Sequence, residues 1–154
     1  MYKPLEKKDW KVLSALASEI ASILISDMEA GVDPDRQPSF EEVNLYSKMH
    51  GQIEFMEMKY GPHPMILDTK ADFVKEPDEQ IRLKELAISL CRSDDYDLRG
   101  NITKELAELY ADEKNEIERA SKLIEKAISD LEKGNDPNDL AEAKEIRDKI
   151  SNSK

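Results

Sequence analysis

A chain of 154 residues has the length of one domain, and its 39% hydrophobic and 37% charged residues separate it from disordered chains. The formal net charge of −11 disfavours nucleic acid and anionic membranes as partners and favours a basic protein or peptide. The single cysteine excludes an internal disulfide. The first residues do not form a secretory signal and no stretch is apolar enough to span a bilayer, so we expect a cytoplasmic protein.

Apolar residues at helical spacing predict an all-α fold in a single domain, residues 1–154. The first helix is expected from Asp9, a good N-cap, to Gly31, a good C-terminal residue. Ser39 and Glu42 form a capping box that opens the second helix, which stops at Gly61. The later predicted helices span residues 65–75, then from Pro77 to the break at residues 93–95, and then from after residue 95 to 112, 115–133 and 140–150.

The same spacing predicts which side of each helix is buried. The first helix has a broad apolar stripe that predicts burial on more than one side. The residues expected to face inward in the first, second and fourth helices include Trp10, Leu13, Leu16, Ala17, Ile20, Ile23, Leu24, Met28, Val43, Tyr46, Met49, Ile53, Met56, Tyr60, Ile81, Leu86, Ala87 and Leu90. The last helix has a thin apolar face, as expected for a terminal cap.

A helix pair occurs twice in the second half of the chain. Residues 71–74 are echoed at 107–110, an offset of 36 residues, and residues 85–89 are echoed at 125–129, an offset of 40. A period in this range is typical of stacked helical hairpins. The sequence therefore predicts about three antiparallel hairpins and a C-terminal capping helix, with a compact helical bundle as the alternative.

The second copy resembles a tetratricopeptide repeat. Ala107 and Tyr110 match the small and aromatic residues of that family's first helix, and Ala120, Ile124 and Ala127 match the small, large, small triplet of its second helix. The match is imperfect, because the two helices are one residue further apart and the closing proline is missing. The resemblance implies a right-handed superhelix of helical hairpins that holds a protein or peptide on the concave face.

That implied face is formed by the first helix of each hairpin. Its exposed polar candidates are Asp68, Lys70, Asp72, Lys104, Glu105 and Glu108. Phe55 and Met58 lie off the apolar stripe of the second helix and are candidates for an apolar partner-binding patch. The expected partner-binding residues are thus Asp68, Asp72, Glu105, Glu108, Phe55 and Met58.

No catalytic motif or nucleotide-binding loop occurs, and no cofactor is expected. We therefore expect a non-enzymatic interaction module. One alternative is a bacterial immunity or antitoxin-like protein that neutralises a basic toxin. Another is a metal protein or enzyme that uses His50, Glu54 and His63, because residues one helical turn apart can bind one metal ion.

Overall fold

The computed structural model describes residues 1–154 as seven helices, which hold three quarters of the chain, and no strand. The predicted all-α class is confirmed. The helices are α1 (Lys7–Glu29), α2 (Phe40–Tyr60), α3 (Pro64–Asp72), α4 (Pro77–Leu90), α5 (Tyr96–Asp112), α6 (Ile117–Lys133) and α7 (Pro137–Ser151). None of them has the length and hydropathy needed to cross a bilayer.

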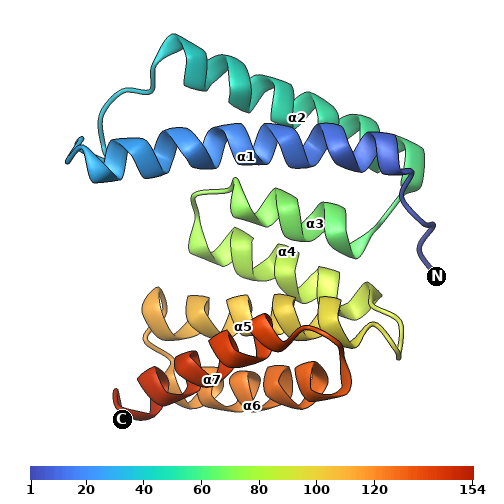
Figure 1. Ribbon diagram of the computed structural model, residues 1–154, viewed down its shortest axis with the longest axis vertical. Coiled ribbons are helices and arrows are strands. Elements are labelled where there is room, and N and C mark those ends of the chain that lie inside the picture. Colours follow the sequence, from blue (N-terminus) through green and yellow to red (C-terminus); the bar gives the residue numbers. More distant parts are fainter. The chain divides into compact units, whose positions relative to one another are not determined.

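The chain divides into two compact units. One unit, Lys3–Gly61, is a helical hairpin in which α1 and α2 lie side by side and antiparallel (Figure 1). Its buried side chains come from one stripe of each helix, with Leu13 and Ile20 on α1 and Met49, Ile53 and Met56 on α2.

The other unit consists of Met1–Tyr2 and Pro62–Lys154. Each helix from α3 to α7 contacts the next one in the chain, and α5 also contacts α7. The larger of its two apolar cores joins α4, α5, α6 and α7, and the smaller joins α3, α4 and α5. This is the arrangement of two hairpins, α3–α4 and α5–α6, followed by one further helix (Figure 1).

Local signals in the sequence set several helix ends, but the predicted N-cap Asp9 is wrong, because α1 begins at Lys7 and Asp9 lies inside it. The Ser39 side chain accepts a hydrogen bond from the backbone of Glu42 at 3.2 Å, as the predicted capping box requires. Pro77 is the first residue of α4, and the Asp136 carboxylate caps α7 by accepting from the backbone of Asp139 at 3.1 Å. Gly31 follows α1 with a φ of 70°, a conformation that favours glycine.

Equivalent alanines of the two helix pairs are fully buried. Ala71 and Ala107 lie on α3 and α5, while Ala87 and Ala127 lie on α4 and α6. Small residues at these points let neighbouring helices approach closely. Gly100 allows a further close approach, since a Cβ there would lie 2.7 Å from Cγ of Leu131 on α6.

Some residues expected to face inward are exposed. Leu24 and Met28 at the end of α1, and Val43 at the start of α2, are exposed because no third element covers them within the hairpin. Leu86 on α4 is exposed as well. The third helix also ends at Asp72, three residues before the predicted end.

The first two residues belong with the C-terminal unit. The Tyr2 hydroxyl donates to Asp95 at 2.6 Å, and its ring meets the ring of His63 edge-on at 4.5 Å. The Arg92 guanidinium lies over the Tyr2 ring and donates to its backbone carbonyl. Burial and the Asp95 carboxylate raise the pKa of Tyr2 to about 12.

Candidate functional site

A lysine surrounded by carboxylates lies where α3, α4 and α5 meet. Lys84 projects from α4 and is only 4% exposed. Its Nζ donates to Asp68 Oδ1 at 2.7 Å, to Glu105 Oε2 at 2.6 Å and to Asp72 Oδ1 at 3.2 Å. A single positive charge thus ties together acids from two other helices, and the cluster retains an excess of negative charge.

Burial and charge act in opposite directions on these groups. Burial alone would lower the pKa of Lys84, but the carboxylates of Glu105, Asp68 and Asp72 outweigh it and raise that pKa. Burial, with the neighbouring Asp68 carboxylate, raises the pKa of Glu105 to about 7. Burial also raises the pKa of Asp72. The Lys84 ammonium opposes the shift at Glu105 by its charge and by its hydrogen bond to that carboxylate.

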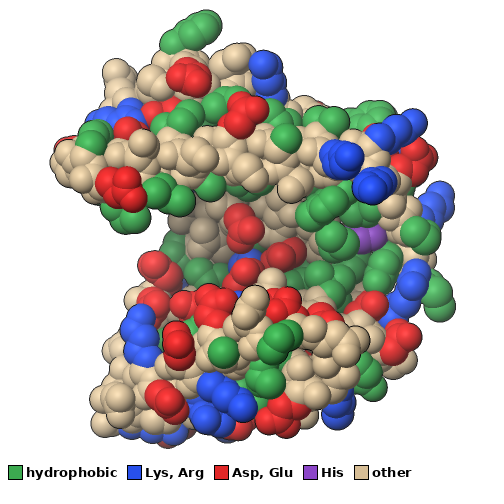
Figure 2. All heavy atoms as spheres, in the orientation of Figure 1, with side chains coloured by type: hydrophobic (Ala, Val, Ile, Leu, Met, Phe, Trp, Pro, Cys, Tyr) green, Lys and Arg blue, Asp and Glu red, His purple; other side chains and the backbone are tan.

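An open pocket of about 290 Å³ lies beside this cluster. We call it the acidic pocket; its lining residues are Ala71, Asp72, Gln80, Lys84, Glu105, Glu108, Leu109, Asp112 and Glu113. Figure 2 shows acidic side chains gathered along α5, the helix that supplies the largest share of this lining. Five of the nine residues are acids, and the only base already has three carboxylate partners.

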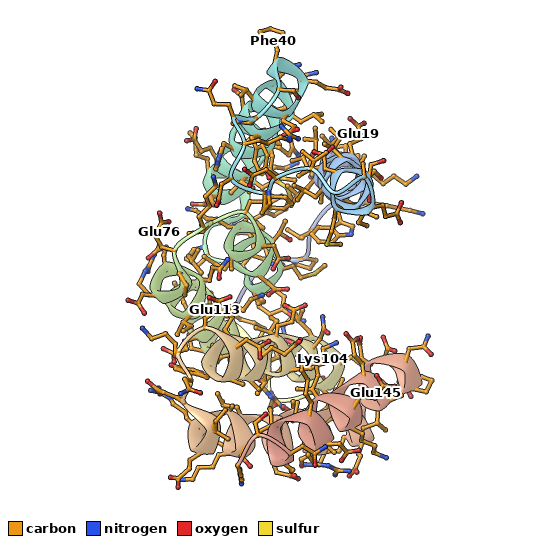
Figure 3. The ribbon with its side chains drawn as sticks, turned by 90° about the vertical axis from the view of Figure 1, so that its left-hand side faces the viewer. Glu19, Phe40, Glu76, Lys104, Glu113 and Glu145 are labelled. Atoms are coloured by element: carbon orange, nitrogen blue, oxygen red, sulfur yellow. The ribbon has the colours of Figure 1, made fainter.

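A second buried lysine extends the charged surface from α5 to α7. The ammonium of Lys104 donates to Glu142 at 2.8 Å and to Asp139 at 3.3 Å, and Figure 3 shows Lys104 beside α7. Glu108 and Asp112 line both the acidic pocket and a smaller pocket of about 130 Å³ against α7. These two acids of α5 therefore face both the α3–α4 side and the α7 side of that helix.

Comparison with known proteins does not assign this site. No family model matches the chain, nor does any curated protein or solved structure. The chemistry of the acidic pocket must be inferred from its own side chains.

The only group of three or more metal-binding side chains with ligand atoms in reach of one another is Asp68, Asp72 and Glu105. Their carboxylate oxygens lie within 4.8 Å of one another, which is close enough to share a cation. The Lys84 ammonium already donates to all three, so the protein supplies its own cation there. This arrangement favours a structural ion cluster over a metal centre.

The histidines considered as metal ligands have other surroundings. His63 is buried at the start of α3, where its Nδ1 accepts from the backbone N–H of Met65 at 3.1 Å. That bond uses one ring nitrogen as a helix cap. His50 and Glu54 are exposed on α2, in the other compact unit.

Cys91 has the environment of an unreactive thiol. It ends α4, and its Sγ donates to the Ala87 carbonyl at 3.4 Å. Burial raises the pKa of the Cys91 thiol to about 11, so it remains protonated at neutral pH.

Four of the six expected partner-binding residues, Asp68, Asp72, Glu105 and Glu108, come together on α3 and α5 in or beside the acidic pocket. Phe55 and Met58 are exposed on α2, in the hairpin unit, and do not belong to it. Lys104, expected to be exposed, is buried.

The sequence did not predict the role of Lys84, because its carboxylate partners lie on α3 and α5 and not on its own helix. One signal was available in the sequence. Asp68 and Asp72 are four residues apart, so they lie on one face of a helix and repel each other unless a cation from another helix lies between them.

Proposed function

We propose that the chain is a non-enzymatic interaction module, a helical repeat of the tetratricopeptide-like kind, that binds a basic protein or peptide at the acidic pocket. The observation that carries this proposal is the composition of the pocket lining, five acids and one neutralised lysine. An open pocket of this size with negative walls suits a lysine or arginine side chain better than a buried small substrate.

Two further features support the proposal. The residues that resemble the tetratricopeptide pattern, Ala107, Tyr110, Ala120, Ile124 and Ala127, are all buried in the core of α5 and α6. The acidic residues lie on α3 and α5, the first helix of each hairpin, and that family holds its peptides with the corresponding helices. The net charge of −11 would also speed the approach of a basic partner at low salt.

The test compares two pairs of charge reversals that change the net charge equally. Fluorescence anisotropy would measure the affinity for labelled lysine- and arginine-rich peptides. Glu105→Lys with Glu108→Lys should weaken binding by about tenfold or more, because each reversal replaces an attraction with a repulsion. Glu118→Lys with Glu125→Lys, at exposed positions on α6, should change it by less than about twofold.

A second variant tests the pocket charges without breaking any bond to Lys84. Glu108→Lys with Asp112→Lys reverses two pocket charges that make no bond to that lysine, so the cluster stays intact. This variant should also weaken peptide binding by about tenfold. An equal loss from the α6 control pair would show that only net charge matters and would contradict the proposal. A protein that neutralises a basic toxin would use the same acids, and its tight complex with one intact partner would distinguish it.

A further inference from the structure

The free end of the α1–α2 hairpin carries an exposed apolar surface. We call residues 24–43 the hairpin tip; they comprise the end of α1, the connecting loop and the start of α2. Its large exposed side chains are Leu24, Ile25, Met28, Phe40 and Val43. Met28 is 74% exposed and Phe40 is 90% exposed, and Figure 3 shows Phe40 pointing away from the hairpin.

Apolar exposure is concentrated in this unit. Eight of the ten exposed large hydrophobic residues lie on α1 and α2, and five of those eight are in the hairpin tip. Apolar patches with a polar rim on an otherwise charged protein are typical of docking sites.

The hairpin tip encloses a pocket of about 510 Å³. Its lining includes Leu24 and Met28 from α1, and Val32 and Pro34 from the loop. This volume lies in the range of about 300–1,000 Å³ that is usual for ligand pockets. The hairpin tip therefore offers a recess for apolar side chains as well as an exposed surface.

The pocket wall is held in place by one arginine. The guanidinium of Arg36 forms ion pairs with Asp27 on α1 and with Glu42 on α2. It also donates to the carbonyl of Gln37 at 3.0 Å, and the Asp33 carboxylate accepts from the backbone of Asp35 at 3.0 Å. These bonds join the loop to both helices, so the recess is built into the fold.

The charge around the recess selects the partner. Residues 24–43 contain six acids, and Arg36 is their only base. Arg36 is paired with Asp27 and Glu42. The remaining acids of the hairpin tip are exposed and have no basic residue within it: Glu29, Asp33, Asp35 and Glu41. An acidic rim repels an anionic membrane surface and attracts lysine and arginine.

We propose that the hairpin tip binds a cationic amphipathic helix, whose apolar side enters the recess while its basic flanks meet the acidic rim. Two antiparallel helices without a sheet edge favour a helix in the groove over an added strand. The exposed residues follow helical spacing on each side, with Leu24 and Met28 on α1 and Phe40 and Val43 on α2. The site lies wholly in the hairpin unit and does not rest on the proposed function of the acidic pocket.

The probe is a labelled peptide of about 15 residues made of leucine and lysine, with leucines at i, i+3, i+4 and i+7. Fluorescence anisotropy would compare it with two peptides: one with the same composition but dispersed leucines, and one with glutamate in place of lysine. We expect the amphipathic cationic peptide to bind at least about tenfold more tightly than either.

Matched variants locate the binding site. Met28→Ser with Val43→Ser removes two apolar contacts of the hairpin tip and should weaken binding by about tenfold. Phe55→Ser with Met58→Ser removes two exposed apolar side chains of α2 outside the hairpin tip and should leave the affinity within about twofold. Glu118→Lys with Glu125→Lys, at exposed positions on α6, should also leave it within about twofold.

Three results would overturn the proposal. Equal binding of the dispersed peptide would mean that charge alone attracts the probe. Unchanged affinity in the Met28→Ser, Val43→Ser variant would place the probe elsewhere. Self-association of the protein that this variant abolishes, measured by light scattering at micromolar concentration, would show that a second copy occupies the surface.

Discussion

At the scale of single residues, the position of Lys84 decides whether the acids of α3 and α5 can lie together. Burying the Lys84 ammonium costs desolvation free energy, and its three carboxylate partners offset that cost by attraction and hydrogen bonding. Removing the lysine leaves three acids close together without a cation. The cost then comes from the acids that remain as much as from the lost hydrogen bonds.

Lys84→Met tests this dependence. We expect the free energy of unfolding to fall by about 3 kcal/mol, because one variant breaks three charge-assisted hydrogen bonds at a buried site. Urea denaturation followed by circular dichroism would measure it. Lys126→Met, at an exposed position on α6, should change stability by less than about 0.5 kcal/mol.

The double variant separates lost contacts from unbalanced charge. Adding Glu105→Gln to Lys84→Met removes one of the uncompensated acids, so it should recover about 1 kcal/mol or more. If Glu105→Gln destabilises the Lys84→Met protein instead, repulsion among the acids is not the source of the cost.

The raised pKa of Glu105 predicts a pH dependence of stability. Its value rises from 4.5 to about 7, so between these pH values the folded protein holds more protons on this group than the unfolded chain does. The contribution of Glu105 to stability therefore falls as pH rises through this window. In Glu105→Gln this fall is absent, and its melting temperature relative to the natural protein should increase by about 2–4 °C between pH 5 and pH 8. Differential scanning fluorimetry at constant ionic strength would measure it, and Glu118→Gln, at an exposed position, should show no such trend.

At the scale of the helices, two glycines in similar local structure should respond in opposite ways. Gly100 faces α6, where a Cβ would lie 2.7 Å and 2.9 Å from side-chain atoms of Leu131, so Gly100→Ala should lower the free energy of unfolding by about 1–3 kcal/mol. Gly51 lies within α2 with nothing near its missing Cβ, so Gly51→Ala should raise it by up to about 1 kcal/mol. Denaturant titration of both variants would measure the difference. Equal effects would mean that helix propensity, not the α5–α6 approach, governs Gly100.

The sequence predicts a helix end where a local signal defines it. Ser39 and Asp136 accept hydrogen bonds from the backbone three residues later, and Pro77 occupies the first position of α4. It predicts exposure poorly where a helix lacks neighbours. Periodicity places Leu24 and Met28 on the apolar side of α1, but only the tertiary arrangement determines whether another element covers that side.

The acids of the candidate site could be predicted from the sequence, but their lysine partner could not. The grouping of Asp68, Asp72, Glu105 and Glu108 follows from the repeat, since equivalent helices present equivalent faces. Lys84 could not be placed, because its partners belong to α3 and α5 and meet it only in the folded unit.

At the scale of the whole molecule, the division into two units predicts how a fragment behaves. Neither apolar core of α3–α7 includes a residue before Leu67. A fragment of residues 62–154 should therefore keep its helicity and unfold cooperatively. Thermal unfolding followed by circular dichroism would test it, with Ile124→Ala as the destabilised comparison because Ile124 is fully buried in the larger core. A fragment without a cooperative transition would contradict this view.

The attachment of Tyr2 also affects the order of events during folding. The rings of Tyr2 and of the buried His63 meet within one unit, and about 60 residues of chain lie between the two residues. While the residues between them are unfolded, closing a loop of that length costs about 3.6 kcal/mol of chain entropy, which the contacts of Tyr2 must offset. Tyr2 leaves the ribosome before its partner Asp95, which is made 93 residues later. Tyr2 can therefore form this bond only after Asp95 has been synthesised.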